Sequence, residues 1–114
     1  MDKPWGYELI WAVTEKFAGK LLFVKAGESL SLQFHNVKDE AWYVLEGKAQ
    51  LELGAPGERV LSSEVIGRGV AFHVPPGTVH RLSALEDTTI FEVSTPELDD
   101  VVRLEDRYGR EGTA

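Results

Sequence analysis

The sequence contains no cysteine, and this absence excludes several kinds of chemistry at once. Without a thiol the chain has no disulfide framework, no thiolate metal site and no cysteine nucleophile. Such a chain suits a reducing compartment, and we expect a cytoplasmic protein. A reactive site must be built from other residue types.

Long hydrophobic runs are also missing, and positive charge is scarce. The first apolar run, residues 9–13, is far too short for a signal peptide core or a membrane span, and no basic segment precedes it. Lys and Arg number 12 against 19 Asp and Glu, which gives a formal net charge of −7. A field of this sign repels nucleic-acid backbones, so we expect no nucleic-acid partner and no membrane association. A local group of basic residues can still bind an anionic small molecule.

A helical period is the third missing feature. No interior window of ten or more residues has apolar residues recurring with the period of 3.6 that an amphipathic helix requires. Short apolar or alternating runs recur instead, separated by Gly, Pro or acidic turn residues. The runs are residues 21–25, 30–35, 41–45, 49–53, 70–74, 79–82 and 89–93. The chain is therefore predicted to be all-β, with antiparallel strands that close into a barrel or jelly roll to protect their edges.

One compact domain accounts for all 114 residues, 43% of which are hydrophobic. We expect the barrel core over about residues 20–95. A short N-terminal arm is expected to pack onto the barrel through Trp5 and Tyr7. Residues 96–114 are mostly charged and are expected to form a C-terminal tail, either a short helix or an arm laid over the barrel.

The run that begins at Leu30 carries side chains that are unusual for a strand. Apolar and polar residues alternate along it in the order Leu30, Ser31, Leu32, Gln33, Phe34 and His35. A pleated strand places the two sets on opposite faces, so one interpretation buries the apolar set and leaves Gln33 and His35 in water. If the polar set lines a cavity instead, the apolar set faces outward, and a partner subunit is its simplest cover. We therefore expect a homodimer.

Two further polar residues lead into apolar strand faces. Glu40 begins a run in which Trp42 has the same parity, and His80 begins a run in which Leu82 has the same parity. Polar residues in these positions are hard to explain as a solvated surface. They indicate a pocket with an apolar floor, with Trp42 as part of its wall.

These polar residues, with the glycines and prolines around them, resemble the two motifs of the cupin family. The first motif comprises Gly27, Gln33, His35, Glu40 and Gly47, and the second comprises Gly69, Pro75, Gly77 and His80. Gln33 stands where cupins usually carry His, and Ala84 stands where they usually carry Asn. The resemblance implies a single-domain cupin jelly-roll barrel that binds a divalent metal ion through Gln33, His35, Glu40 and His80.

Gln33 and three further stretches are similar to the type II phosphomannose isomerase branch of the cupins. The stretches are "KPWGYE", "VPPGTVHRL" and "DDVVRLEDRYGR". The branch also occurs as the C-terminal part of bifunctional mannose-1-phosphate guanylyltransferases, but no Gly-rich nucleotide-binding segment is present, so guanylyl transfer is not expected. The chain departs from the branch at Ala41, where the His of an "EHW" triplet is usual.

Two imidazoles, a carboxylate and an amide oxygen form a mixed set of ligands. We expect Zn²⁺ at this site, with Mn²⁺, Fe²⁺, Ni²⁺ and Co²⁺ as alternatives. Such a site keeps open positions for a substrate carbonyl or hydroxyl. The residues expected to contact a sugar or sugar phosphate are Lys38, Trp42, Arg103 and Arg110, and Arg81 and Arg107 are further candidates for binding a phosphate.

The general base is not assigned by the sequence. Glu46, Glu92 and Lys25 fall on predicted strands and could reach the cavity. His73 lies close to His80 in the sequence, but the apolar alternation around it indicates that it points away from the interior. We expect His73 to be a surface histidine.

Three functions remain open. The first is a metal-dependent sugar-phosphate isomerase of the mannose-6-phosphate type, which interconverts an aldose and a ketose. The second is a metal-binding cupin that binds a carbohydrate or another small metabolite without turnover. The third is a metal-dependent dioxygenase, although such enzymes usually have more histidine ligands than Gln33 allows. Basic residues at the pocket would favour the isomerase, and an apolar pocket mouth would favour the binding module or the dioxygenase.

Overall fold

Two six-stranded antiparallel sheets make up the fold. The computed structural model describes residues 1–57 and 61–113, so Ala114 of the predicted tail lies outside it. The strands are β1 (Asp2–Lys3), β2 (Gly6–Val13), β3 (Ala18–Val24), β4 (Leu32–Phe34), β5 (Glu40–Glu46), β6 (Lys48–Gly54), β7 (Ser62–Gly67), β8 (Ala71–Val74), β9 (Val79–Ala84), β10 (Thr88–Ser94), β11 (Val102–Glu105) and β12 (Gly112–Thr113). The first sheet has the order β1-β2-β3-β10-β5-β8, and the second has the order β12-β11-β4-β9-β6-β7.

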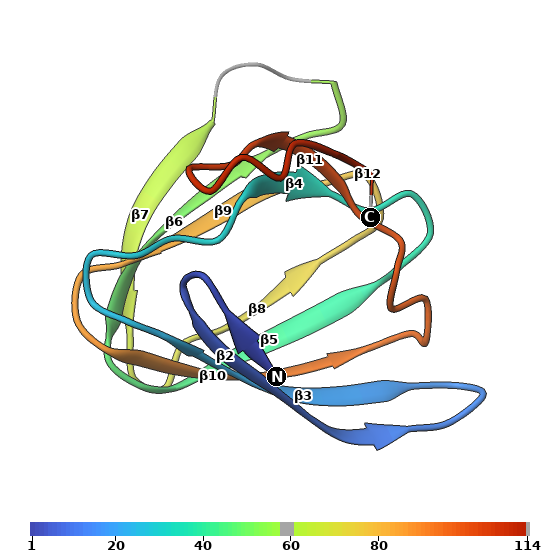
Figure 1. Ribbon diagram of the computed structural model, residues 1–114, viewed down its shortest axis with the longest axis horizontal. Helices are drawn as coiled ribbons and strands as arrows, with labels where there is room; N and C mark the ends of the chain where they lie inside the picture. Colours follow the sequence, from blue (N-terminus) through green and yellow to red (C-terminus); the bar gives the residue numbers. More distant parts are fainter. Residues whose placement is uncertain (58–60, 114) are drawn as a thin grey trace.

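Figure 1 shows the two sheets as facing layers around a common interior. All seven predicted runs form strands. The predicted all-β jelly roll is therefore confirmed. No helix long and apolar enough to cross a membrane occurs in the part of the chain that the structure describes.

Both ends of the chain add strands that the sequence reading missed. The predicted N-terminal arm forms β1 and β2, and β2 pairs with β3 in the first sheet. Trp5 is buried in the core as expected, whereas Tyr7 lies on the outer face and stacks on Phe23. The tail forms β11 and β12 and no helix among its described residues, and β11 pairs with β4 in the second sheet.

The core lies between the two sheets and is built from alternate residues of the central strands. Along β10, burial alternates with exposure residue by residue over its last five positions. The most deeply buried side chains of the core include Leu22, Val24, Val44, Leu51, Leu82 and Ile90. Burying large aliphatic side chains in this way contributes about 1.5–3 kcal/mol for each one.

The burial of the residues around β4 corrects one expectation. Leu30 and Leu32 are only 6% and 7% exposed in the single chain, and Phe34 is half-buried. The predicted alternation fails because β4 begins only at Leu32, and both Leu30 and Ser31 before it are buried. These leucines therefore do not need a partner subunit to cover them.

Two glycines of the predicted motifs provide a test of the fold. Gly47 has φ 103° between β5 and β6, and a Cβ there would lie 2.4 Å from the carbonyl oxygen of Asp87. Gly69 has φ 88°, but a Cβ there meets nothing within 4 Å. Gly69→Ala should lower the free energy of unfolding by only about 1 kcal/mol, because alanine is strained in the left-handed conformation. Gly47→Ala adds a clash with backbone and should lower the free energy of unfolding by about 3 kcal/mol.

Urea denaturation of the two variants beside the wild type measures this difference. Gly69→Ala serves as the control because it has the same kind of backbone strain without the clash. If both variants unfold at the same urea concentration, the close approach of Gly47 to the backbone of Asp87 does not limit which residue the turn can hold.

Candidate metal centre

Three candidate metal ligands come from separate parts of the chain. Glu40 is the first residue of β5, His80 lies in β9, and His35 directly follows β4. The pairing of β4 with β9 brings Gln33 opposite His80. The backbone N–H of Gly77 also donates to the carbonyl of His35 at 2.7 Å. These contacts hold the ends of the two strands together and bring the three side chains into one buried space.

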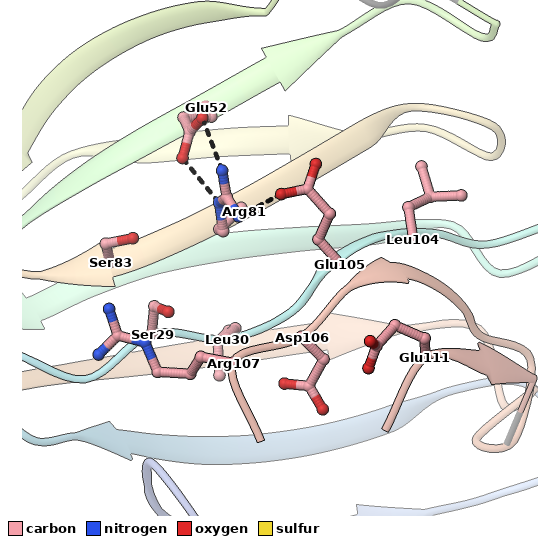
Figure 2. A pocket seen from close by; sticks show the side chains of 10 residues that line it. All are labelled: Ser29, Leu30, Glu52, Arg81, Ser83, Leu104, Glu105, Asp106, Arg107 and Glu111. Carbon is pink, nitrogen blue, oxygen red and sulfur yellow. Dashed lines mark hydrogen bonds and ion pairs between the residues drawn. The ribbon is translucent and has the colours of Figure 1, made fainter. Parts of the chain in front are cut away.

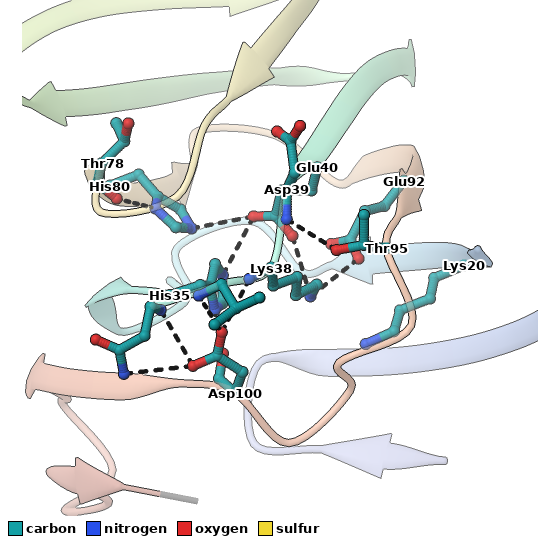
Figure 3. A network of polar contacts seen from close by, with 12 residues as sticks. Lys20, His35, Lys38, Asp39, Glu40, Thr78, His80, Glu92, Thr95 and Asp100 are labelled. Carbon is teal, nitrogen blue, oxygen red and sulfur yellow. Dashed lines mark hydrogen bonds and ion pairs between the residues drawn. The ribbon is translucent and has the colours of Figure 1, made fainter. Parts of the chain in front are cut away.

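The two imidazoles converge on one carboxylate oxygen (Figure 3). His35 Nε2 and His80 Nε2 each lie 3.3 Å from Glu40 Oε1. Ligand atoms of the three residues all lie within 4.8 Å of one another. The side chains are deeply buried, since His35, Glu40 and His80 are 5%, 2% and 1% exposed. The structure thus brings together three of the four expected ligands, and Gln33 lines the same cavity.

Backbone carbonyls determine which ring nitrogen of each histidine carries the proton. His35 Nδ1 lies 2.5 Å from the carbonyl oxygen of Asp100, and His80 Nδ1 lies 2.9 Å from that of Thr78. A carbonyl can only accept, so each Nδ1 donates and each neutral ring directs an Nε2 lone pair toward Glu40. Within the described residues, Glu40 Oε1 and His80 Nε2 have no hydrogen-bond partner.

Lone pairs that face one another in a buried space require a positive charge between them, either added protons or a metal ion. Two imidazole nitrogens and a carboxylate oxygen are common ligands of divalent metals. The residues present therefore fit a divalent metal ion, while the identity of the metal stays a prediction.

Glu40 stays ionised in this setting. Burial alone would raise the pKa of its carboxyl group, but hydrogen bonds from His35 and His80, when their Nε2 atoms are protonated, and the ammonium of Lys38 hold the pKa well below its usual range. Lys38 Nζ lies 3.0 Å from Glu40 Oε2. The second carboxylate oxygen is thereby neutralised on the side away from the histidines.

Lys38 links the candidate metal centre to a second buried acid. Its Nζ lies 3.3 Å from Glu92 Oε2, and Glu92 is paired in register with Lys20 on the neighbouring strand. Burial raises the pKa of the Glu92 carboxyl, Glu40 raises it further, and Lys38 and Lys20 offset only part of this increase. Burial alone would lower the pKa of Lys38, but Glu92 and Glu40 together raise it above its usual value.

A cavity of about 550 Å³ opens over these groups. Its volume falls in the range of small-molecule sites, roughly 300–1,000 Å³. The cavity is lined by the four expected metal ligands, Gln33, His35, Glu40 and His80, and by four residues expected to contact a sugar or sugar phosphate, Lys38, Trp42, Arg103 and Arg110. Their contacts with a metal ion or a substrate stay predictions.

The basic residues of the cavity differ in how far they are already paired. Arg110 Nε donates to Asp106 at 2.7 Å, and Lys20 lies 3.5 Å from Glu8. Arg103 and Lys3 also line the cavity and form no ion pair among the described residues. Sequence reasoning had not selected Lys3, although it begins the "KPWGYE" stretch.

Of the three residues considered as a general base, one lines the cavity and two do not. Glu92 lines the cavity, whereas Glu46 and Lys25 are exposed and do not line it. His73 is exposed, with its Nε2 2.5 Å from Asp39, so the prediction of a surface histidine is confirmed.

Asp100 supports the centre from the tail and was missed by sequence reasoning. Its carboxylate accepts hydrogen bonds from the backbone N–H groups of Asn36, Val37 and Lys38 at 3.1, 2.7 and 2.9 Å. Burial alone would raise the pKa of Asp100, but these three donors bring it down to about 2. Its carbonyl also orients His35, so one residue fixes both the loop and the ring.

A second cavity, of about 540 Å³, is lined by residues of β9 that face away from His80 (Figure 2). Arg81 there donates to Glu52 at 2.8 and 3.2 Å and lies 3.5 Å from Glu105. Arg107 donates to the carbonyl of Gly27 at 2.6 Å. Neither arginine lines the cavity of the metal centre, and Arg81 pairs with Glu52, as in the alternative in which these residues form salt bridges.

Comparison with known proteins agrees with this architecture. The family model described as "Mannose-6-phosphate isomerase C-terminal" matches residues 1–106. The mannose-1-phosphate guanylyltransferase ManC of Salmonella typhimurium is 37% identical over 114 residues, which cover 95% of this chain and 22% of the relative. The xanthan biosynthesis protein XanB of Xanthomonas campestris pv. campestris is 36% identical, over 95% of this chain and 23% of the relative. The chain thus spans less than a quarter of the length of these curated relatives.

Solved structures show the same fold. KdgF from Halomonas sp. has a TM-score of 0.66 and 26% identity, with 81% of this chain and 79% of that chain covered. A cupin superfamily protein from Desulfitobacterium hafniense has a TM-score of 0.68 and 14% identity, over 80% and 77% of the two chains. With the family model over most of its length, the chain belongs to the cupin family described as mannose-6-phosphate isomerase C-terminal.

Proposed function

We propose that this cupin is a metal-dependent isomerase that interconverts an aldose phosphate and a ketose phosphate of the mannose-6-phosphate type. One observation carries the proposal: a single cavity combines the His35–Glu40–His80 group, the buried acid Glu92 and basic side chains that form no ion pair with any described residue. The family description, which names mannose-6-phosphate isomerase, supports it.

His35, Glu40 and His80 would hold the metal ion, with the amide oxygen of Gln33 as a fourth ligand and zinc as the expected metal. When bound, the ion would act as a Lewis acid that stabilises negative charge developing on the substrate oxygens at C1 and C2. Asp100 and Thr78 hold the two imidazole rings in the tautomer that this role requires.

Glu92 is the proposed proton carrier. The ionised Glu92 carboxylate takes the proton from C2 of the open-chain aldose and, as the carboxylic acid, returns it to C1, while the hydroxyl proton passes from O2 to O1. An aldose thereby becomes a ketose with no net gain or loss of atoms or electrons. The raised pKa of Glu92 suits this task, since a base works best when its pKa lies near the working pH. Lys38 holds the carboxylate in place.

Arg103 and Lys3 are the proposed phosphate ligands. Both line the cavity without an ion-pair partner among the described residues, whereas Arg110 is already engaged by Asp106. A guanidinium fork matches two phosphate oxygens, and the lysine adds a point charge. Basic residues at the cavity favour the isomerase over a dioxygenase.

A binding module without turnover is the second candidate. One observation favours it: Lys38 already pairs with Glu92, and this contact competes with the proposed proton transfer. Such a module would still bind metal and a sugar phosphate. The two functions therefore differ only in turnover, which the assays below measure directly.

Metal content tests the candidate ligands. His80→Ala should lose most of the bound zinc after reconstitution, because it removes one of only two imidazole ligands. The matched control is His73→Ala, which changes an exposed histidine and should leave the metal content unchanged. Elemental analysis by mass spectrometry gives the metal content of each purified protein, with circular dichroism to verify folding. A folded His80→Ala with the wild-type zinc content would remove this centre from consideration.

Substrate affinity tests the phosphate site. Removing a hydrogen-bonded charge costs about 1.5–3 kcal/mol, so Arg103→Ala should raise the KM for the phosphorylated hexose at least about tenfold. Arg68→Ala is the control, because Arg68 is exposed and does not line the cavity. The measurement is aldose–ketose interconversion with mannose 6-phosphate and other phosphorylated hexoses. Failure of the zinc-loaded wild type on every one of them would favour the binding module.

The proton carrier is tested by kcat. Glu92→Gln should lower kcat by at least about 100-fold with metal content nearly unchanged, since Gln keeps the shape but cannot accept the proton. The acidic limb of the wild-type pH profile, in which activity rises as Glu92 loses its proton, should disappear. Glu46→Gln is the matched control on an exposed strand position. Wild-type kcat in Glu92→Gln would require a different proton carrier.

A further inference from the structure

One row of side chains on the inner face of the first sheet lines the cavity of the metal centre. Strand register aligns Ile10, Lys20, Glu92 and Trp42 across β2, β3, β10 and β5, and all four border the cavity. Lys20 and Glu92 stand directly opposite each other in the middle of this row. Residues paired in this way have Cβ atoms about 4.5–5.5 Å apart. A substrate atom that Glu92 can reach therefore lies within reach of Lys20 as well.

The ammonium group of Lys20 is buried but loosely held. Lys20 is only 7% exposed, and its one ion pair among the described residues is with Glu8, whose Oε2 lies 3.5 Å from Nζ. Lys38, by contrast, lies 3.0 and 3.3 Å from the carboxylates of Glu40 and Glu92. Figure 3 draws Lys20 and Glu92 with no contact between them. An ammonium has three N–H donors, so Lys20 has donors left for a ligand in the cavity.

The proposed isomerisation needs a second proton carrier. Glu92 moves the carbon-bound proton from C2 to C1, and a carboxylate occupied by that proton cannot also carry the hydroxyl proton from O2 to O1. The second carrier must lie beside Glu92, since O1 and O2 are bonded to the two carbons that Glu92 serves. It must also approach these oxygens to within about 2.6–3.2 Å.

Lys20 is the basic side chain of the cavity that meets these conditions. Lys38 is fixed between two carboxylates. A guanidinium keeps its proton in proteins, so Arg103 and Arg110 cannot exchange one with the substrate. Lys3 is a proposed phosphate ligand, and the phosphate of a hexose 6-phosphate lies at the far end of the sugar from C1 and C2. A lysine can donate a proton as the ammonium and accept it back as the amine.

We propose that Lys20 is a catalytic residue that carries the hydroxyl proton between O2 and O1 of the sugar phosphate. The inference rests on the proposed isomerase function. As the Glu92 carboxylate takes the proton from C2, the C–H electron pair forms the C1–C2 double bond, and the carbonyl oxygen O1 takes a proton from the Lys20 ammonium. The neutral amine then takes the proton from O2, the carbonyl forms at C2, and the electrons of the double bond take the proton of the Glu92 acid at C1. Both side chains end as they began, and the aldose phosphate has become the ketose phosphate.

Two substitutions at Lys20 separate proton transfer from charge. Lys20→Met removes the ammonium and should lower kcat of the zinc-loaded protein at least about 100-fold, with KM changed by no more than about threefold. Lys20→Arg keeps a positive charge opposite Glu92 but cannot release a proton, so it should be about as slow as Lys20→Met. The control is Lys25→Met, which changes an exposed lysine outside the cavity and should leave kcat unchanged. Circular dichroism and zinc content verify that each variant is folded and loaded.

Exchange of the C2 proton with D2O gives a readout that a structural role of Lys20 would not move. Nuclear magnetic resonance measures, early in the reaction, the deuterium at C2 of the recovered aldose phosphate against the ketose phosphate formed. Without Lys20 the intermediate cannot pass its hydroxyl proton on and reverts, so the ratio of exchange to conversion should rise at least about tenfold in Lys20→Met. A residue that only positions Glu92 would lower exchange and conversion by the same factor and leave the ratio unchanged.

Lys20→Gln is the second variant in case Lys20→Met does not fold, because its amide can still donate to Glu8 but has no proton to transfer. The same loss of kcat and the same rise in the exchange ratio are expected. Wild-type kcat in these variants, a rate restored in Lys20→Arg, a raised KM in place of a lowered kcat, or an unchanged exchange ratio each overturns the role of Lys20 and leaves the isomerase in place. A zinc-loaded wild type that neither converts nor exchanges any phosphorylated hexose overturns the proposed function, and this inference with it.

Discussion

The candidate site depends on one constraint, which is that two imidazole lone pairs and a carboxylate oxygen share one buried space. His35 and His80 each give their Nδ1 proton to a backbone carbonyl, so a neutral ring has none left for Glu40. In a medium of low polarity this arrangement is unfavourable until a cation lies between the three groups. The surrounding contacts follow from it, since Lys38 neutralises the far oxygen of Glu40 and in turn binds Glu92.

Strand alternation gives the first sheet two different faces. Along β10, Glu92 faces the cavity, whereas Phe91 and Val93 face outward. Neighbouring strands follow the same rule, because Lys20 and Trp42 line the cavity while Leu21 and Tyr43 pair in register with Phe91 on the outer face. The first sheet therefore separates the charged cavity from an apolar outer surface by only the thickness of one backbone layer.

The resemblance to the two cupin motifs pointed to His35, Glu40 and His80, and the fold brings ligand atoms of these three residues together. Strand alternation alone did not decide whether His35 faces the cavity or water. The same reasoning missed β2, in which apolar Leu9 and Trp11 are exposed while Glu8 lines the cavity together with Ile10, so the strand has no simple apolar alternation. It also did not decide the role of Arg81, since its pairing with Glu52 follows from the register of β6 with β9. No local pattern reports a contact across so much intervening chain.

The tail shows why the metal centre cannot be separated from the rest of the fold. Asp100 orients His35 and holds residues 36–38, and a few residues later Arg103 pairs in register with Gln33. A histidine that binds a cation becomes a stronger donor at its other nitrogen, so metal binding should strengthen the bond from His35 to the Asp100 carbonyl. Linkage requires the reverse as well: docking of the tail against β4 must increase metal affinity by the same factor. The segment that brings Arg103 to the cavity is thus also the segment that stabilises the ligands.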